Sequence, residues 1–448
     1  MIEKRFAEPA PAGSANFNPR ESLMNEETAL QQEQIQNHGW RVTFAGMGIN
    51  LALGILYTWS VISKHIPADW GWDEDDKSLP YMFACLIFSL VMVPAGRMQD
   101  KLSPRIVATI GGVLVGLGFI LTSMTTSVAA FVLGFGVLAG AGIGFGYASA
   151  TPPAVKWFGP AKTGMIAGIV VSGFGLASVY ASFVTTWLIG SFGFQTAILI
   201  WGIVFLVTVV GLAQLLKPPP PGYKPLTAGP APALQSNKKE DFRPAEMLGT
   251  IQFYLLWFMY ACGAGAGLMI ISKLAAIADK QIGITLGFLL VAVLAVGNGA
   301  GRVVAGILSD KIGRKATMFI CFVSQAIFIF LISKAKSENA LGTIPVMCLL
   351  SALIGANYGA NLALFPSITK DFYGIKNFGM NYGLVFTAWG VGGFLLAKLA
   401  GAMYVKYQAF AIAYYGAAAL LILAAVMVFF LKPPHHSLEI TSSPDIGK

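Results

Sequence analysis

The chain alternates between long apolar stretches and short polar segments over almost its whole length. About 20 consecutive apolar residues in an α-helix are needed to cross the hydrocarbon core of a bilayer. That criterion predicts twelve transmembrane helices, at residues 42–64, 79–97, 105–123, 128–151, 163–187, 193–216, 250–273, 283–309, 316–334, 341–366, 378–403 and 408–431. The pattern therefore indicates an all-α protein that crosses the membrane many times.

Composition supports this interpretation, because 56% of the 448 residues are hydrophobic and only 11% are charged. Ordinary soluble domains carry about 25% charged residues. The four cysteines lie within predicted spans and lack metal-ligand spacing, so we expect neither a metal site nor a cofactor.

The basic residues are distributed unevenly between the two sets of connecting loops. Short loops on the side of both termini hold ten lysines and arginines, whereas the opposite loops hold seven lysines and no arginine. Cytoplasmic loops carry the excess of basic residues in membrane proteins. We therefore expect a cell-membrane protein with both termini in the cytoplasm. The net charge of +9 follows from this bias, so it does not indicate nucleic-acid binding.

A segment rich in proline and lysine interrupts the apolar pattern after the sixth predicted span. Consecutive prolines cannot continue a helix and favour an extended chain. The sequence predicts a cytoplasmic tail at 1–38, a six-helix bundle at 39–216, a cytoplasmic linker at 217–248, a second six-helix bundle at 249–432 and a cytoplasmic tail at 433–448. Within the first tail, Asn25 to Asn37 is predicted to form a short helix capped by Asn25.

Arg302 falls deep inside the eighth predicted span. It lies eight residues before Asp310, which marks the end of that helix, or about 12 Å at the helical rise. A charge at this depth costs roughly 2.5–3.5 kcal/mol even on lenient insertion scales, so it should face a cavity or a partner. Its planar fork suits a carboxylate, and Asn298 shares its helical face. The alternative is a structural arginine that donates to backbone carbonyls of a neighbouring helix.

Polar side chains recur every seven residues along the first predicted span, at Thr43, Asn50, Tyr57 and Lys64. Residues spaced in this way lie on one face of a helix. We expect this stripe to line a cavity. The alternative for Tyr57 is a packing side chain whose hydroxyl is satisfied in the core.

Two loops in corresponding positions of the two halves share glycine, an acid and basic residues. Gly96 to Lys101 follows the second predicted span, and Gly306 to Lys315 follows the eighth. Such repetition is typical of carriers whose halves rock about a central site. We expect these charged helix ends to latch the halves together in one state, through Asp100, Lys101, Arg105, Asp310, Arg314 and Lys315. Ordinary basic loops with helix caps are the alternative.

The motif in these loops, G-x-x-x-D-(R/K)-x-G-(R/K)-(R/K), resembles that of the major facilitator superfamily. The second copy fits throughout, whereas the first departs after Lys101. The resemblance implies twelve transmembrane helices in two six-helix bundles. It also implies a transporter rather than an enzyme.

Several short stretches, ordered from the first span to the twelfth, carry a finer resemblance. They are Leu56–Ser60, Gly146–Tyr147, Val155–Phe158, Pro220–Tyr223, Phe253–Trp257, Asn298–Arg302 and Asn381–Gly383. Together they resemble the oxalate:formate antiporter family, whose members carry small organic anions. The resemblance implies that Arg302 binds the substrate carboxylate, supported by Asn298, Tyr57, Tyr147, Phe174 and Tyr358.

One departure from that family concerns the charge of the site. The dicarboxylate-carrying oxalate antiporter has a lysine in the eleventh span, where this chain has Trp389. Lys398 lies nine residues further on, about 180° round a regular helix, and is expected to reach the membrane interface. With one deep cation, a second buried carboxylate would be unpaired and costly. The expected substrate is therefore a monocarboxylate such as lactate, pyruvate or formate, bound near Trp389.

Other functional classes find less support in the sequence. It contains no G-x-x-x-x-G-K-(S/T) loop for a nucleotide and no histidine within the predicted spans. No Asp or Glu lies inside a predicted span either, which favours anion exchange. We expect the carrier to be a monomer. The alternatives are a proton-linked monocarboxylate symporter, an oxalate or other dicarboxylate antiporter, and a membrane anion sensor that does not transport.

Overall fold

The computed structural model describes residues 37–158, 163–220, 223, 241–283, 285–374 and 377–434. Over these residues the chain is helical, and twelve helices are long and apolar enough to cross a membrane. The predicted all-α class and the number of spans are therefore confirmed. The short helix expected at Asn25–Asn37 and most of both tails lie outside the described residues.

Six membrane-length helices precede the linker. The first is composite, made of α2 (Gly39–Leu53), the 3₁₀ segment η1 (Gly54–Thr58) and α3 (Trp59–Lys64). The second and third are α4 (Leu79–Lys101) and α5 (Pro104–Ser123). The fourth is also composite, made of α6 (Val128–Phe131), the π-helical segment η4 (Val132–Ala139) and α7 (Gly140–Val155). The fifth and sixth are α8 (Thr163–Phe192) and α9 (Phe194–Ala213).

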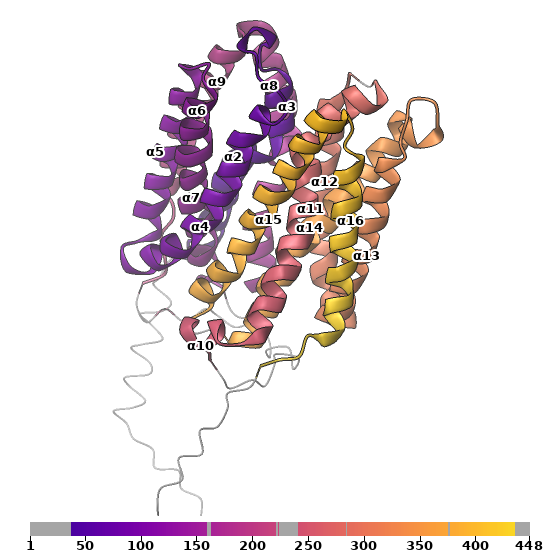
Figure 1. Cartoon of the computed structure of the whole chain (residues 1–448). Helices are drawn as coiled ribbons and strands as arrows, with labels where there is room; N and C mark the ends of the chain where they lie inside the picture. The colour runs from indigo at the N-terminus through magenta and orange to yellow at the C-terminus, as the bar shows by residue number, and fades with distance from the viewer. Residues whose placement is uncertain are drawn as a thin grey trace, which may run out of the picture.

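Six more follow the short helix α10 (Pro244–Leu248). They are α11 (Ile251–Ile282), α12 (Gly287–Ile312), α13 (Arg314–Ser333), α14 (Ile344–Tyr373), α15 (Phe378–Tyr407) and α16 (Ala411–Phe430). Figure 1 shows the two groups as separate bundles, indigo to magenta for the first half and rose to yellow for the second. The halves meet where α4 packs on α15 and α8 packs on α12. This is the predicted arrangement of two six-helix bundles.

Two of the membrane helices begin at a capping side chain. Pro104 occupies the first turn of α5, and the Ser103 hydroxyl accepts a hydrogen bond from the Arg105 amide. At α11, the Thr250 hydroxyl accepts from the Phe253 amide. Both side chains satisfy amides that have no partner within the first turn of a helix.

Two helices extend well beyond the predicted spans. α11 continues to Ile282 and α14 to Tyr373, whereas apolar composition ended these spans at 273 and 366. Lys280 and Asp279, which follow the predicted span, therefore lie on α11, and Lys273 is not its last residue. A helix can leave the hydrocarbon region and continue with polar residues, which a hydropathy criterion does not detect.

Both ends of the linker are attached to the bundles at one end of the molecule, which we call the linker end. Tyr223 donates to the Trp157 carbonyl in the first half at 3.4 Å. In the second half, the Phe242 carbonyl accepts from Asn377 and Asn381, at 3.1 Å each. The opposite end, which carries the loops 65–78 and 334–343, is the far end.

The break in the first span moves Tyr57 out of regular helical register. A Cβ atom on Gly54 would lie 2.5 Å from the Phe174 carbonyl oxygen, so only glycine lets α8 approach this closely. The 3₁₀ segment that begins at Gly54 carries Tyr57, which is buried between the halves. A 3₁₀ stretch within a long helix often marks a functional hinge or a strained segment.

Candidate functional site

Arg302 lies in the middle of the molecule on α12, and only 5% of its surface is exposed. Its Nε donates to Asn298 Oδ1 at 3.1 Å, one turn earlier on the same helix. Its Nη1 donates to the Val171 carbonyl on α8 at 2.7 Å. The expected pairing of Arg302 with Asn298 is present. The guanidinium also forms the backbone contact of the structural alternative, and this contact joins the two halves.

Part of this pair is without a partner. Among the described residues, Arg302 Nη2 and Asn298 Nδ2 are buried and make no hydrogen bond of regular geometry, and the Tyr147 hydroxyl lies near the guanidinium. Within the same residues, no carboxylate lies within ion-pair distance of Arg302. A buried polar group without a hydrogen bond is costly, and a buried charge without a counter-ion more so. The free donors are therefore suited to an anion that carries acceptor oxygens.

A second contact between the halves lies nearby. The Tyr57 and Tyr358 hydroxyls are 2.5 Å apart, and Trp389 Nε1 donates to the Tyr358 hydroxyl at 2.8 Å. Tyr57 belongs to the first half, whereas Tyr358 on α14 and Trp389 on α15 belong to the second. Each of the three side chains is buried. Each of them was predicted to lie at the site, but the sequence does not show that they form hydrogen bonds with one another.

The remaining predicted aromatic residues join the same cluster. The Phe174 ring centroid lies 4.9 Å from that of Tyr57 and 5.3 Å from that of Tyr147, both edge-on. All seven predicted substrate-binding residues are therefore gathered at the interface between the halves. Their role in binding stays a prediction.

Several residues of this centre were missed from the sequence. The Phe88 ring on α4 packs against Tyr147, Phe174 and Trp389, with centroids 5.0–5.8 Å apart. Val171 contributes its carbonyl. A Cβ on Gly175 would lie 3.3 Å from Arg302 Nε, so this glycine leaves room for the guanidinium. A phenylalanine, a valine and a glycine in apolar helices carry no signal that separates them from packing residues.

The polar stripe of the first span is only partly at this centre. Asn50 donates to the Val170 carbonyl at 2.9 Å, and Thr43 donates to the Gly39 carbonyl of its own helix at 2.7 Å. Both are fully buried within the first half. The expectation that the whole stripe lines a cavity is wrong for this structure, because two of its members satisfy backbone groups. Tyr57 alone reaches the aromatic cluster.

Lys398 is exposed on α15, whereas Trp389 on the same helix is fully buried. The two residues therefore face different environments, as the helical spacing predicts. The lysine does not add a second cation to the centre in this structure.

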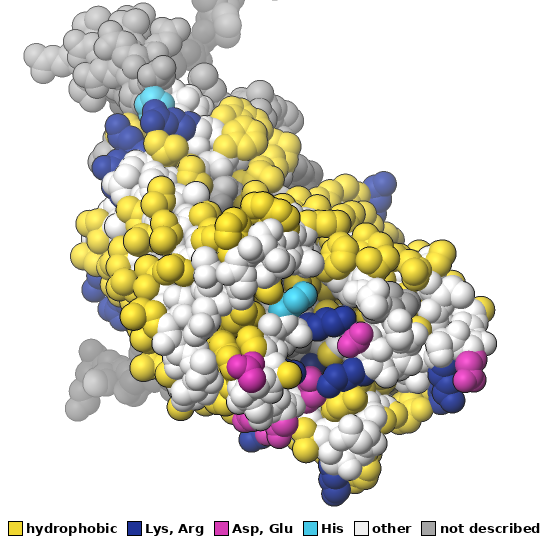
Figure 2. Space-filling view, turned by 90° about the horizontal axis from the view of Figure 1, so that it is seen from above, with side chains coloured by type: hydrophobic (Ala, Val, Ile, Leu, Met, Phe, Trp, Pro, Cys, Tyr) yellow, Lys and Arg dark blue, Asp and Glu magenta, His cyan; other side chains and the backbone are white. Residues whose placement is uncertain are grey.

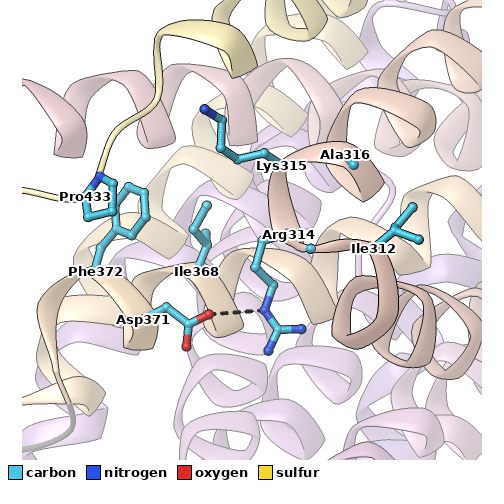
Figure 3. A pocket seen from close by; sticks show the side chains of 9 residues that line it. Ile312, Arg314, Lys315, Ala316, Ile368, Asp371, Phe372 and Pro433 are labelled. Atoms are coloured by element: carbon cyan, nitrogen blue, oxygen red, sulfur yellow. Dashed lines mark hydrogen bonds and ion pairs between the residues drawn. The ribbon is translucent and has the colours of Figure 1, made fainter. Parts of the chain in front are cut away.

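The predicted latch at the linker end is built differently. Arg314 Nη1 donates to Asp310 at 2.7 Å, and its Nε donates to Asp371 at 3.1 Å. Figure 3 shows Arg314 and Asp371 bonded at the side of a pocket that Lys315 and Phe372 also line. All these residues belong to the second half, so these bonds do not join the halves. The remaining predicted latch residues, Lys101, Arg105 and Lys315, are exposed, and the Asp100 side chain lies outside the described residues.

Comparison with known proteins agrees with this architecture. The sequence profile of the Major Facilitator Superfamily matches residues 42–290 and 256–448. The chain belongs to the Major Facilitator Superfamily. Members of this superfamily are transporters, so the expected class of protein is confirmed.

Several relatives are similar over most of their length. An uncharacterised MFS-type transporter, YhjX, of Escherichia coli is 28% identical over 80% of this chain and 86% of its own. The oxalate:formate antiporter of Oxalobacter formigenes is 26% identical over 82% of this chain and 85% of its own. Monocarboxylate transporter 11 of Mus musculus is 24% identical over 84% and 83%. These matches agree with the predicted resemblance and support small organic anions as the class of substrate.

The fold also matches a solved structure. A bacterial homologue of the human lysosomal transporter Spinster, in an inward-facing and unoccupied conformation, superposes with a TM-score of 0.63 at 15% identity. The match covers 89% of this chain and 97% of the other. At this identity the comparison supports the fold alone.

Proposed function

We propose that this transporter carries a small monocarboxylate by alternating access and that Arg302 binds the carboxylate. The observation that carries the proposal is the guanidinium edge at the interface of the halves, buried and without a counter-ion among the described residues. A carboxylate supplies the acceptor oxygens that Nη2 lacks. Asn298 Nδ2, on the adjacent turn, offers one further donor.

Aromatic rings occupy the remainder of this centre. Tyr57, Phe88, Phe174, Tyr358 and Trp389 give the substrate an apolar surface and few groups to hydrogen-bond. A second carboxylate would find no second cation there, because Trp389 takes the place of a lysine and Lys398 is exposed elsewhere on α15. The charge balance therefore favours a substrate with one negative charge over a dicarboxylate.

We further propose that the termini lie in the cytoplasm and that the far end opens to the outside, because the basic loops are at the linker end. Substrate binding would neutralise Arg302 and allow the halves to rock. Exchange of one anion for another is favoured because an empty closed site would leave the guanidinium uncompensated.

The test is uptake of radiolabelled pyruvate, lactate or formate into proteoliposomes, with unlabelled mono- and dicarboxylates as competitors. We expect monocarboxylates to compete more strongly than oxalate. Oxalate competing better than every monocarboxylate would contradict the single-cation argument. Binding without flux in sealed vesicles would favour a sensor.

A second experiment separates exchange from proton-linked symport. Liposomes without internal substrate are compared with liposomes that contain it, each with and without an inwardly directed pH gradient. Exchange predicts fast uptake only when substrate is present inside. Strong accumulation in empty liposomes, abolished by a protonophore, would show that the carrier is a symporter.

A further inference from the structure

A group of charged side chains at the far end joins the two halves and takes no part in the proposed binding site. Glu74 lies in the loop before α4, in the first half, and contacts two lysines on α11 of the second half. Its Oε2 is 3.3 Å from Lys273 Nζ, and its Oε1 is 2.7 Å from Lys280 Nζ. Lys273 Nζ also donates to the Glu74 carbonyl at 3.0 Å.

These charges are unusually buried. Lys273 exposes 4% of its surface and Glu74 exposes 9%. Charged residues are rarely buried to this extent unless they are paired. Burial by itself would raise the pKa of the Glu74 carboxyl, but the charge of Lys273 and the contacts with Lys280 and Lys77 lower it to about 2. Glu74 is therefore an anion at physiological pH.

Hydrogen bonds hold the loop that carries Glu74 in place on the first half. Asp73 Oδ1 accepts hydrogen bonds from the amides of Asp75 and Asp76, at 2.8 Å each. The Ser78 hydroxyl donates to the Glu74 carbonyl at 2.7 Å. The Trp59 indole on α3 donates to the Lys77 carbonyl at 3.0 Å, which attaches this loop, and Glu74 with it, to the first half.

Another ion pair joins the same halves at the same end but is exposed to solvent. Lys64 Nζ on α3 lies 3.3 Å from Asp279 on α11, and the side chains are 26% and 43% exposed. Figure 2 shows acidic and basic side chains gathered toward the middle of this end of the molecule. An exposed pair is screened by water and contributes little, whereas breaking a buried pair leaves a charge uncompensated.

We propose that Glu74 is a latch that holds the far end of the transporter closed through Lys273 and Lys280. Opening of the far end requires α11 to move away from the loop before α4, which separates the carboxylate from both ammonium groups. The latch therefore raises the free energy of the far-open state relative to the closed state. The latch acts only if the two halves rock relative to each other, and its effect does not depend on which substrate is carried.

The test measures the conformation directly, without substrate, so it does not depend on the proposed monocarboxylate. Spin labels are attached to cysteines introduced at Ser127 and Ser337, two exposed residues in far-end loops of the first and second halves. Pulsed dipolar spectroscopy in lipid nanodiscs then gives the ratio of far-open to far-closed molecules. Protein that lacks the two introduced cysteines measures background labelling of the native ones.

Glu74→Gln should raise the far-open to far-closed ratio by about tenfold or more, because Lys273 then has no counter-ion in the closed state. Asp279→Asn, the matched control, should change it less than about twofold. Glu74→Gln combined with Lys273→Met removes the uncompensated charge as well as the latch, so its ratio should lie between those of Glu74→Gln and the unmodified protein. An unchanged ratio in Glu74→Gln, or an equal change in Asp279→Asn, would overturn the proposal.

Lys280→Ala provides a second route if Glu74→Gln does not yield folded protein. It removes one partner of Glu74 but leaves the buried pair with Lys273, so the ratio should rise by a smaller factor, about two- to fivefold. No increase in this variant would overturn the proposal without reference to Glu74→Gln.

Discussion

Arg302 Nη1 donates a hydrogen bond of 2.7 Å to the Val171 carbonyl, so the buried cation of one half is attached to the backbone of the other. A bound carboxylate and the Val171 carbonyl would both accept hydrogen bonds from the same guanidinium. Because α8 and α12 belong to different halves, breaking this bond removes one of the contacts that hold the halves together. The predictions below follow from that relationship and from the residues around it.

Arg302→Ala should reduce monocarboxylate uptake to background while the protein stays folded and monodisperse in detergent. Arg302→Lys should recover little activity, because a point charge cannot reproduce the fork that reaches Val171, Asn298 and a carboxylate together. Both variants are tested by the initial rate of uptake into proteoliposomes, and Lys398→Ala is a control outside the centre. Uptake by Arg302→Ala within twofold of the unmodified protein would remove Arg302 from the site.

Gly175→Ala should weaken substrate binding without loss of the fold. The added Cβ would lie 3.3 Å from Arg302 Nε, so the guanidinium must shift by a few tenths of an ångström. We expect a severalfold increase in the concentration needed for half-maximal uptake and little change in thermal stability. Gly168→Ala on the same helix has no atom within 4 Å of its added Cβ and is the matched control. Equal behaviour of the two variants would contradict this prediction.

Tyr358→Phe should be more damaging than Tyr57→Phe. The Tyr358 hydroxyl accepts from Trp389 Nε1 and contacts the Tyr57 hydroxyl, so its removal leaves two buried groups without their partner. Loss of such a partner costs about 1–3 kcal/mol for each group. Removal of the Tyr57 hydroxyl leaves the bond between Trp389 and Tyr358 intact. Thermal unfolding in detergent measures the difference, and a reversed order would show that this chain of contacts is not formed.

Trp389→Lys should shift the preference toward dicarboxylates. The substitution places a second cation in the centre and removes a ring that packs 5.0 Å from Phe88. Oxalate should then compete more strongly with labelled monocarboxylate than it does in the unmodified protein. Trp389→Phe keeps an aromatic ring without the charge and separates the two effects. An increase in oxalate competition in Trp389→Phe as well would show that space, rather than charge, sets the preference.

The far-end latch should be insensitive to pH over the physiological range. The Glu74 carboxyl has an ordinary pKa of 4.5 and a pKa of about 2 beside Lys273, Lys280 and Lys77. Its stabilisation of the closed state is therefore fully present above about pH 4.5 and is lost as the pH falls toward 2. The spin-label distance ratio should be constant between pH 5 and 8. A titration of that ratio near neutral pH that disappears in Glu74→Gln would show that Glu74 has a much higher pKa.

The membrane architecture could be predicted from the sequence alone, because a helix that lies in lipid must be composed mainly of apolar residues. Twelve apolar runs predicted twelve helices, and the loop motif that occurs in both halves predicted the superfamily. Arg302 was also evident from the sequence alone, since a guanidinium at membrane depth is costly unless it has a function or a partner. Trp389 and Lys398 were placed on different faces by helical spacing, and the structure agrees.

Tertiary structure decided which groups are partners, because contacts between residues hundreds of positions apart leave no local pattern. Val171, Gly175 and Phe88 are ordinary residues of apolar helices, yet they surround Arg302 or its aromatic neighbours. The same reason applies at the far end. In the sequence, Glu74 is one of several acids in the loop 65–78, and Lys273 is the last residue of a predicted span. Only the packing of α11 against the first half buries these two charges together and joins the halves there.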